Sequence, residues 1–167
     1  MQLNSLNDVL VDQLADVYSA ERQLVEALPK IAGAASNTEL REAIQEHLEE
    51  TRGHVRRLEQ VFQDLDISPP AETCEAMQGL IAEGEQIIQA QGDADAKDAA
   101  LIAAAQRVEH YEIAAYGTVR TLARELGHKD AASLMGETLD EESQADELLT
   151  KIATGGMVGS GINRQAR

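Results

Sequence analysis

Apolar residues recur at three- and four-residue steps through four long segments of this chain, the spacing that places side chains on one face of an α-helix. Runs of alternating apolar and polar residues, which are typical of β-strands, are missing, and the only prolines are Pro29, Pro69 and Pro70. The sequence therefore predicts an all-α protein. The expected helices cover residues of about 5–33, 38–65, 73–90, 95–126 and 130–153, followed by a tail at 154–167 without a helical pattern.

The lengths of the connections predict how these helices are arranged. Short joints follow the first and third long helices, so each of these helices should form an antiparallel hairpin with its successor. The link over 66–94 is long enough to cross the bundle, and it carries the short helix at 73–90. Two hairpins and one long crossover make a ferritin-like four-helix bundle, and we expect residues 1–167 to form one such domain.

The charge of the chain argues against several classes of partner. Asp and Glu total 30 against 14 Lys and Arg, which gives a net charge of −16. Such a chain lacks the basic surface that nucleic acid requires, and anionic lipid would repel it. No segment has the pattern of a signal peptide or a membrane span, and a single cysteine, Cys74, allows no intrachain disulfide. We therefore expect a cytoplasmic protein with neither a nucleic-acid nor a membrane partner.

Each of the four long apolar stripes is interrupted near its middle by polar residues. Glu21, Glu112 and Glu142 interrupt the first, third and fourth stripes. The second stripe carries a polar group of its own: His47, Glu50, Thr51 and His54. One buried glutamate could be protonated, but several carboxylates near one bundle axis would repel each other, and no Lys or Arg lies on the stripes beside them. Bound metal ions are the simplest counter-charge.

Carboxylate and imidazole donors at helical spacing suit iron or manganese, with zinc as an alternative. The central candidate ligands are the carboxylates of the four stripes: Glu21, Glu50, Glu112 and Glu142. His47, one turn before Glu50, is interpreted as a further ligand. Glu109 and Asp146 are interpreted as ligands or as residues that contact the ligands, with solvated charges beside the stripe as the alternative, and for His54 a ligand role and a core role are equally open. Tyr116, one turn from Glu112, is expected to pack in the core, with a hydrogen bond to a ligand as the alternative.

At these residues the sequence resembles the YciE/YciF family of bacterial ferritin-like stress proteins, over nearly the whole chain. The segments that carry the resemblance are Tyr18–Leu24, His47–Thr51, Ala100–Gln106, Val108–Ala114 and Thr138–Glu142. The resemblance implies a bundle that holds two metal ions, a role in stress response and assembly into a homodimer.

The sequence departs from the usual ferritin-like ligand pattern, in which two helices each supply a Glu and the other two each supply Glu-x-x-His. The second segment has His47-x-x-Glu50, and the fourth has Glu142 followed by Asp146. The third has Glu109-x-x-Glu112, which is similar to the additional carboxylate of rubrerythrin-type sites. Which residues fill the histidine positions therefore stays open.

Three functions fit this pattern. The first is a di-metal redox protein with oxidase or peroxidase-type activity, whose substrate is a small oxidant such as peroxide or oxygen. The second is a metal-binding or storage protein without catalysis. The third is a metal-free structural bundle whose polar core is partly protonated.

Overall fold

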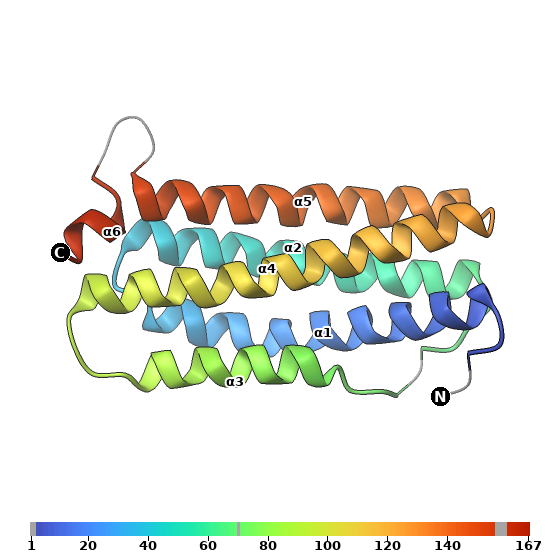
Figure 1. The fold of residues 1–167 in the computed structure, drawn as a ribbon, viewed down its shortest axis with the longest axis horizontal. Coiled ribbons are helices and arrows are strands. Elements are labelled where there is room, and N and C mark those ends of the chain that lie inside the picture. Colours follow the sequence, from blue (N-terminus) through green and yellow to red (C-terminus); the bar gives the residue numbers. More distant parts are fainter. Residues whose placement is uncertain (1–2, 70, 156–159) are drawn as a thin grey trace.

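The computed structural model describes residues 3–69, 71–155 and 160–167 of the chain. These residues form six helices and no strand, so the protein is all-α as the sequence predicts (Figure 1). The helices are α1 (Leu6–Ala34), α2 (Thr38–Asp64), α3 (Glu75–Gln89), α4 (Ala94–Glu125), α5 (Lys129–Thr154) and α6 (Ile162–Gln165). The first five begin and end within two residues of the ranges expected from the sequence.

The tail differs from the expectation. Residues Ile162–Gln165 form the short helix α6, which lies against α4 and α5, and Ile162 is buried there. A stretch of four residues is too short for an apolar repeat to be recognised in the sequence. The part of the predicted tail at 156–159 lies outside the described residues.

The helices have the ferritin-like arrangement of two antiparallel hairpins. One hairpin is α1 with α2 and the other is α4 with α5, and the helices within each hairpin make the most extensive contacts in the molecule. Between the hairpins the chain returns along the bundle through α3, which packs on the outside of α1 and α4 (Figure 1). This crossover lets α2 and α4 run in the same direction.

A buried aspartate fixes the joint between α1 and α2 to α4. The carboxylate of Asp98, in the first turns of α4, accepts hydrogen bonds from the backbone N–H groups of Ser36 (2.9 Å) and Asn37 (2.6 Å). Asn37 is the residue before α2, and its side chain in turn accepts from the N–H of Leu40, as an N-cap does. Asp98 thereby satisfies backbone donors that no helix supplies with a partner.

The core consists of two apolar regions with a polar layer between them. One region includes Leu28, Leu40 and Leu101, and the other includes Leu14, Phe62 and Met135, all of them buried. The buried polar layer lies on the helix stripes between these regions and comprises Glu21, His47, Thr51, His54, Glu109, Glu112, Thr138 and Glu142. The interruptions of the stripes in the sequence therefore lie at one level of the bundle.

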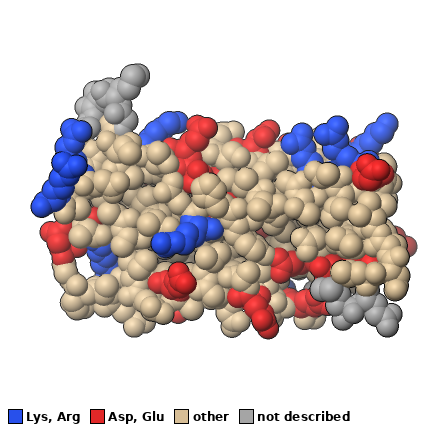
Figure 2. Space-filling view, viewed as in Figure 1, with Lys and Arg blue, Asp and Glu red and all other residues tan. Residues whose placement is uncertain are grey.

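The charged side chains on the face shown in Figure 2 form small groups separated by uncharged surface, with basic groups along its upper edge and left end. None of the helices in the described ranges has the length and apolar character that a membrane span requires.

Candidate metal centre

The structure brings six ligand-type side chains together in the middle of the bundle, from all four long helices. In each of two groups, one donor atom from every residue lies within 4.8 Å of those of the others. The first group is His47, Glu109, Glu112 and Glu142, and the second is Glu21, His54 and Glu142. Every one of these residues is buried.

Glu142, on α5, belongs to both groups through its two oxygens. Its Oε2 lies 3.7 Å from Nε2 of His47, and its Oε1 lies 2.9 Å from Nδ1 of His54. The same histidine nitrogens face further carboxylates: Glu109 Oε1 is 3.5 Å from His47 Nε2, and Glu21 Oε1 is 3.2 Å from His54 Nδ1. The carboxylate of Glu142 therefore lies between two neighbouring positions that could each hold a cation.

Many of the donor atoms of this cluster lack hydrogen-bond partners. Among the described residues, the buried side-chain nitrogen and oxygen atoms without a partner are Glu21 Oε2, His54 Nδ1, Glu109 Oε2, both oxygens of Glu112 and both oxygens of Glu142. All of them belong to the two groups. Since a buried polar atom is costly without a partner, and buried carboxylates especially so, the unpartnered oxygens fit cation ligands better than a packed core.

The carboxyl groups respond to burial and to each other. Burial, followed by the negative charges of Glu142 and Glu21, raises the pKa of Glu112 well above its ordinary value. Burial also raises the pKa of Glu109 well above its ordinary value, against the opposing charge of His47. Without a cation, these two groups are therefore driven toward the protonated form.

The two histidines are shifted in the opposite sense to what burial alone would give. Burial acts to lower the pKa of His47, but the charge of Glu109 and the hydrogen bond to Glu50 raise it to about 9. Burial likewise opposes protonation of His54, but the adjacent carboxylates of Glu142 and Glu21 raise its pKa to about 11. In the absence of metal, both imidazoles thus act as the counter-charge of the carboxylates.

Outer partners orient both histidines. Nε2 of His54 lies 2.9 Å from Oε2 of Glu141, and the guanidinium of Arg57 donates to both oxygens of the same carboxylate. On the other side, Nδ1 of His47 lies 3.3 Å from Oε2 of Glu50. A carboxylate on the far nitrogen fixes the orientation of an imidazole ligand and raises its basicity.

The sequence-predicted residues divide into those inside the cluster and those beside it. The structure brings together Glu21, His47, His54, Glu109, Glu112 and Glu142. Glu50 is in neither group, because its side chain is 41% exposed and contacts the outer nitrogen of His47. Asp146 also lies outside both groups, where its Oδ1 accepts from Gln106 at 3.0 Å and lies 3.5 Å from Nε2 of His110.

Two partners of the cluster, Glu141 and Arg57, have no signal in the sequence, and a third was assigned first to packing. This third residue is Tyr116, for which a hydrogen bond to a ligand was the alternative, and it donates its hydroxyl hydrogen to Oε1 of Glu21. Glu141 and Arg57 are not on the apolar stripes, and their pairing across α2 and α5 has no signal in the sequence. The spacing of Tyr116 from Glu112 was the one available hint that a polar tip could reach the site.

The arrangement is a variation of the Glu-x-x-His pattern. His54 has Thr51 at the glutamate position three residues before it, and Glu142 has Ala145 at the histidine position three residues after it. The extra members of the cluster are His47, two turns before His54 on α2, and Glu109, one turn before Glu112 on α4. The donor set thus keeps two imidazoles, although one has moved to a different helix from the one that the pattern gives.

Comparisons with known proteins extend over almost the whole chain. The family model described as "Domain of unknown function (DUF892)" matches residues 5–166. Protein YciF of Escherichia coli (strain K12) is 47% identical over 154 residues, which cover 92% of this chain and 93% of that protein. The resemblance to the YciE/YciF family is thereby confirmed.

Solved structures agree with this result. The crystal structure of the E. coli stress protein YciF is similar with a TM-score of 0.87 and 47% identity, over 89% of this chain and 94% of that one. YcfI from Rhodopseudomonas palustris is similar with a TM-score of 0.88 and 41% identity, over 91% of this chain and 97% of that one.

Proposed function

The chain belongs to the family of unknown function DUF892, and from that premise we propose that it is a ferritin-like di-metal carboxylate protein that performs redox chemistry on peroxide or oxygen. The observation that supports the proposal is the pair of buried groups that share Glu142 and leave its oxygens without partners. The E. coli relative is called a stress protein, which is compatible with a role of this chain in stress response.

The donor set favours iron or manganese, with zinc as an alternative. It contains the four carboxylates of Glu21, Glu109, Glu112 and Glu142 and one nitrogen from each of two histidines. Two divalent ions would cancel the four negative charges, and hard oxygen donors combined with imidazole suit iron and manganese. His47, Glu109 and Glu112 would hold one ion, Glu21 and His54 the other, and Glu142 both.

When bound, two such ions that each change their valence by one would supply the two electrons that reduce peroxide to water. The residues of this chain supply the surroundings for that chemistry. The far nitrogen of His54 faces Glu141, whose side chain is 31% exposed, so this pair offers protons a route between the site and solvent. Tyr116 holds a hydroxyl hydrogen within the site, at Oε1 of Glu21.

The first experiment measures how many metal ions the protein binds. The protein is made without an affinity tag, reconstituted with ferrous or manganous ions, desalted and analysed by mass spectrometry, with about two ions expected per chain. Glu142→Gln should lose most of this metal, whereas Asp140→Asn, an exposed neighbour on α5, should keep it. If the reconstituted protein held only traces of metal, the proposal would be wrong and the role of a metal-free structural bundle would be favoured.

A second experiment separates catalysis from storage. The metal-loaded protein is mixed with an excess of a chemical reductant and with either hydrogen peroxide or dissolved oxygen, and consumption of the oxidant is followed over many equivalents. Continued consumption, lost in Glu142→Gln, is the expected result. Metal uptake without such turnover would favour the non-catalytic storage protein instead. These assays do not test the homodimer or the cytoplasmic location, and both remain predictions.

A further inference from the structure

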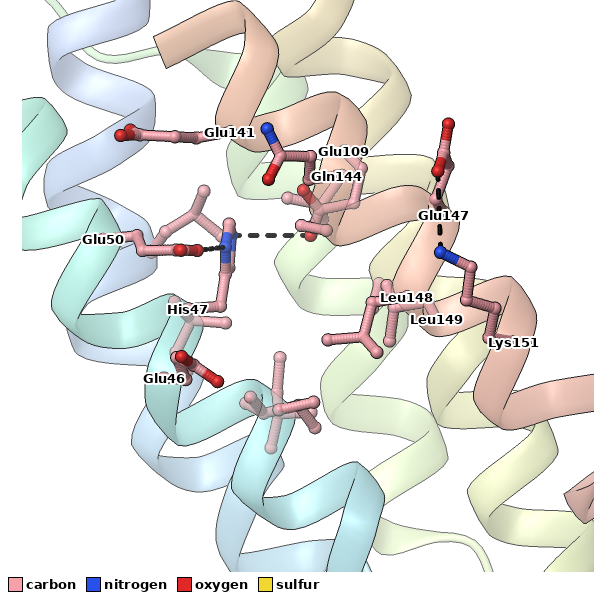
Figure 3. A pocket seen from close by; sticks show the side chains of 18 residues that line it. Glu46, His47, Glu50, Glu109, Glu141, Gln144, Glu147, Leu148, Leu149 and Lys151 are labelled. Atoms are coloured by element: carbon pink, nitrogen blue, oxygen red, sulfur yellow. Dashed lines mark hydrogen bonds and ion pairs between the residues drawn. The ribbon is translucent and has the colours of Figure 1, made fainter. Parts of the chain in front are cut away.

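A pocket opens at the surface between α2 and α5 and reaches the buried cluster (Figure 3). Its volume is about 340 Å³, within the range of roughly 300–1,000 Å³ that is usual for sites of small organic molecules. Residues of α1 and α4 complete its walls. His47 and Glu109, which belong to the first ligand group, line its inner part, so the pocket and the proposed metal site share a wall.

Most of the remaining wall is apolar. Leu24 and Leu28 of α1, Ile44 of α2, Val108 of α4 and Leu149 of α5 line the pocket. Access for peroxide or oxygen alone does not require a lining of this size and character. In contrast, the transfer of a hydrocarbon chain from water to an apolar wall lowers the free energy. The lining therefore indicates an organic occupant with an aliphatic portion.

The charged residues at the outer part of the pocket are mostly acidic, with Lys151 as the cation among them. Glu46, which is exposed, and Glu50 lie on the α2 side, and Glu147 lies on the α5 side (Figure 3). Glu147 is paired with Lys151 at 3.7 Å, whereas within the described part of the chain neither Glu46 nor Glu50 is paired with a Lys or Arg. Negative potential at the opening attracts cations and repels anions.

We propose that this pocket binds a small aliphatic molecule with a cationic head group, of the alkylammonium class. The alkyl chain of this ligand occupies the apolar interior next to His47 and Glu109, and its head group lies at the opening near Glu46 and Glu50. Binding is a property of the protein without metal, so it goes beyond the proposed function. Only the statement that the inner end of the alkyl chain lies next to a metal ion rests on the proposed function.

The test measures binding of three probes of equal chain length to the metal-free protein by isothermal titration calorimetry. Octylammonium is expected to bind with a dissociation constant below about 1 mM. Octanol, which has the same chain without the charge, should bind severalfold more weakly, and octanoate should bind at least about tenfold more weakly than octylammonium because its carboxylate faces the acidic opening.

Two pairs of variants locate the probe. Ala105→Leu fills the pocket from α4 and should weaken octylammonium at least about fivefold, whereas Ala103→Leu, at an exposed position of the same helix, should change it less than about twofold. Glu46→Gln should weaken octylammonium and leave octanol unchanged. Glu49→Gln, whose carboxylate pairs with Arg52 and does not line the pocket, should affect neither probe.

The results that would overturn the proposal are specific. Absence of binding by all three probes at millimolar concentration would show that the pocket takes no aliphatic molecule. Octanoate binding as tightly as octylammonium would reject the cationic class, and unchanged affinity in Ala105→Leu would reject the location. Because no metal is present in these measurements, a failure here says nothing against metal binding, and a failure of metal binding leaves this result intact.

Discussion

Nε2 of His54, buried in the middle of the bundle, lies 2.9 Å from Oε2 of Glu141, a residue that is not a member of either ligand group. Arg57 donates to both oxygens of Glu141, and this contact, more than the contact with His54, holds the pKa of the carboxyl below its ordinary value. Glu141 is thus ionised, and when His54 becomes neutral, as ligation requires, this carboxylate keeps the remaining proton on the outer nitrogen. Nδ1 is then the nitrogen that faces the cluster without a proton.

Glu141→Gln should therefore weaken metal binding although the residue does not face the metal positions. Loss of such an outer partner typically costs about 10–100-fold in metal affinity. Competition against a fluorescent chelator measures this effect, with Asp140→Asn as the matched control on the same helix turn. If Glu141→Gln bound metal as tightly as the natural sequence, the orientation of His54 would not depend on this pair.

Metal binding should release protons near neutral pH. The raised pKa values of His47 and His54, about 9 and about 11, make both imidazoles cationic in the metal-free protein at pH 7. A nitrogen must be deprotonated before it can ligate, so metal affinity should rise with pH, by about one logarithmic unit per pH unit for each proton displaced.

Calorimetry in buffers of different ionisation enthalpy counts these protons directly. The apparent enthalpy of metal binding should change with the buffer between about pH 6 and 8, where both histidines carry protons. An enthalpy independent of the buffer would mean that no protons leave, and would exclude cationic histidines as the ligands. His54→Gln should reduce the number of protons released.

Removal of the buried Asp98 carboxylate should destabilise the fold. Asp98→Ala removes the hydrogen bonds of its carboxylate with the backbone N–H groups of Ser36 and Asn37, and a hydrogen bond to a charged group contributes about 1.5–3 kcal/mol. Urea unfolding of the metal-free protein measures the loss. Glu83→Ala, at an exposed position of α3, should change the free energy of unfolding by less than about 0.5 kcal/mol. Equal stability of the two variants would contradict the structural role of Asp98.

Gly161→Ala should detach α6. A Cβ atom at Gly161 would lie 2.2 Å from the backbone nitrogen of Gly155 and 2.2 Å from the carbonyl carbon of Thr154, so the backbone has to separate. Ile162, which is 1% exposed, would then reach solvent. Faster trypsin cleavage after Arg164 and faster amide exchange in α6 are the expected readouts.

Gly79→Ala is the control for this effect, because its added Cβ meets nothing within 4 Å. In an exposed helix position this change should leave trypsin cleavage at Arg164 unaffected and stabilise the protein by up to about 1 kcal/mol. Unchanged protection of α6 in Gly161→Ala would show that the segment accommodates a methyl group there.

The periodicity of the apolar residues was sufficient to predict the fold. Helix propensity and spacing are local properties of the chain, so they located the four long helices and the shorter α3 with their ends within two residues of the structure. The ferritin-like topology followed from the short joints and the long link at 66–94, because loop length limits which helices can be neighbours. The four-residue helix at Ile162–Gln165 was missed because it is held by contacts with α4 and α5 that have no local pattern.

The sequence by itself determined that carboxylates and histidines interrupt the apolar stripes of all four long helices, because a polar residue on a buried face is visible in the spacing alone. Only the tertiary structure decided which of them meet. The relative rotation and displacement of the helices place His54 at Glu21 and Glu142, and turn Glu50 and Asp146 away from the cluster. The pairing of Arg57 with Glu141 and the pocket between α2 and α5 likewise depend on distances between helices far apart in the chain, which spacing within a helix does not specify.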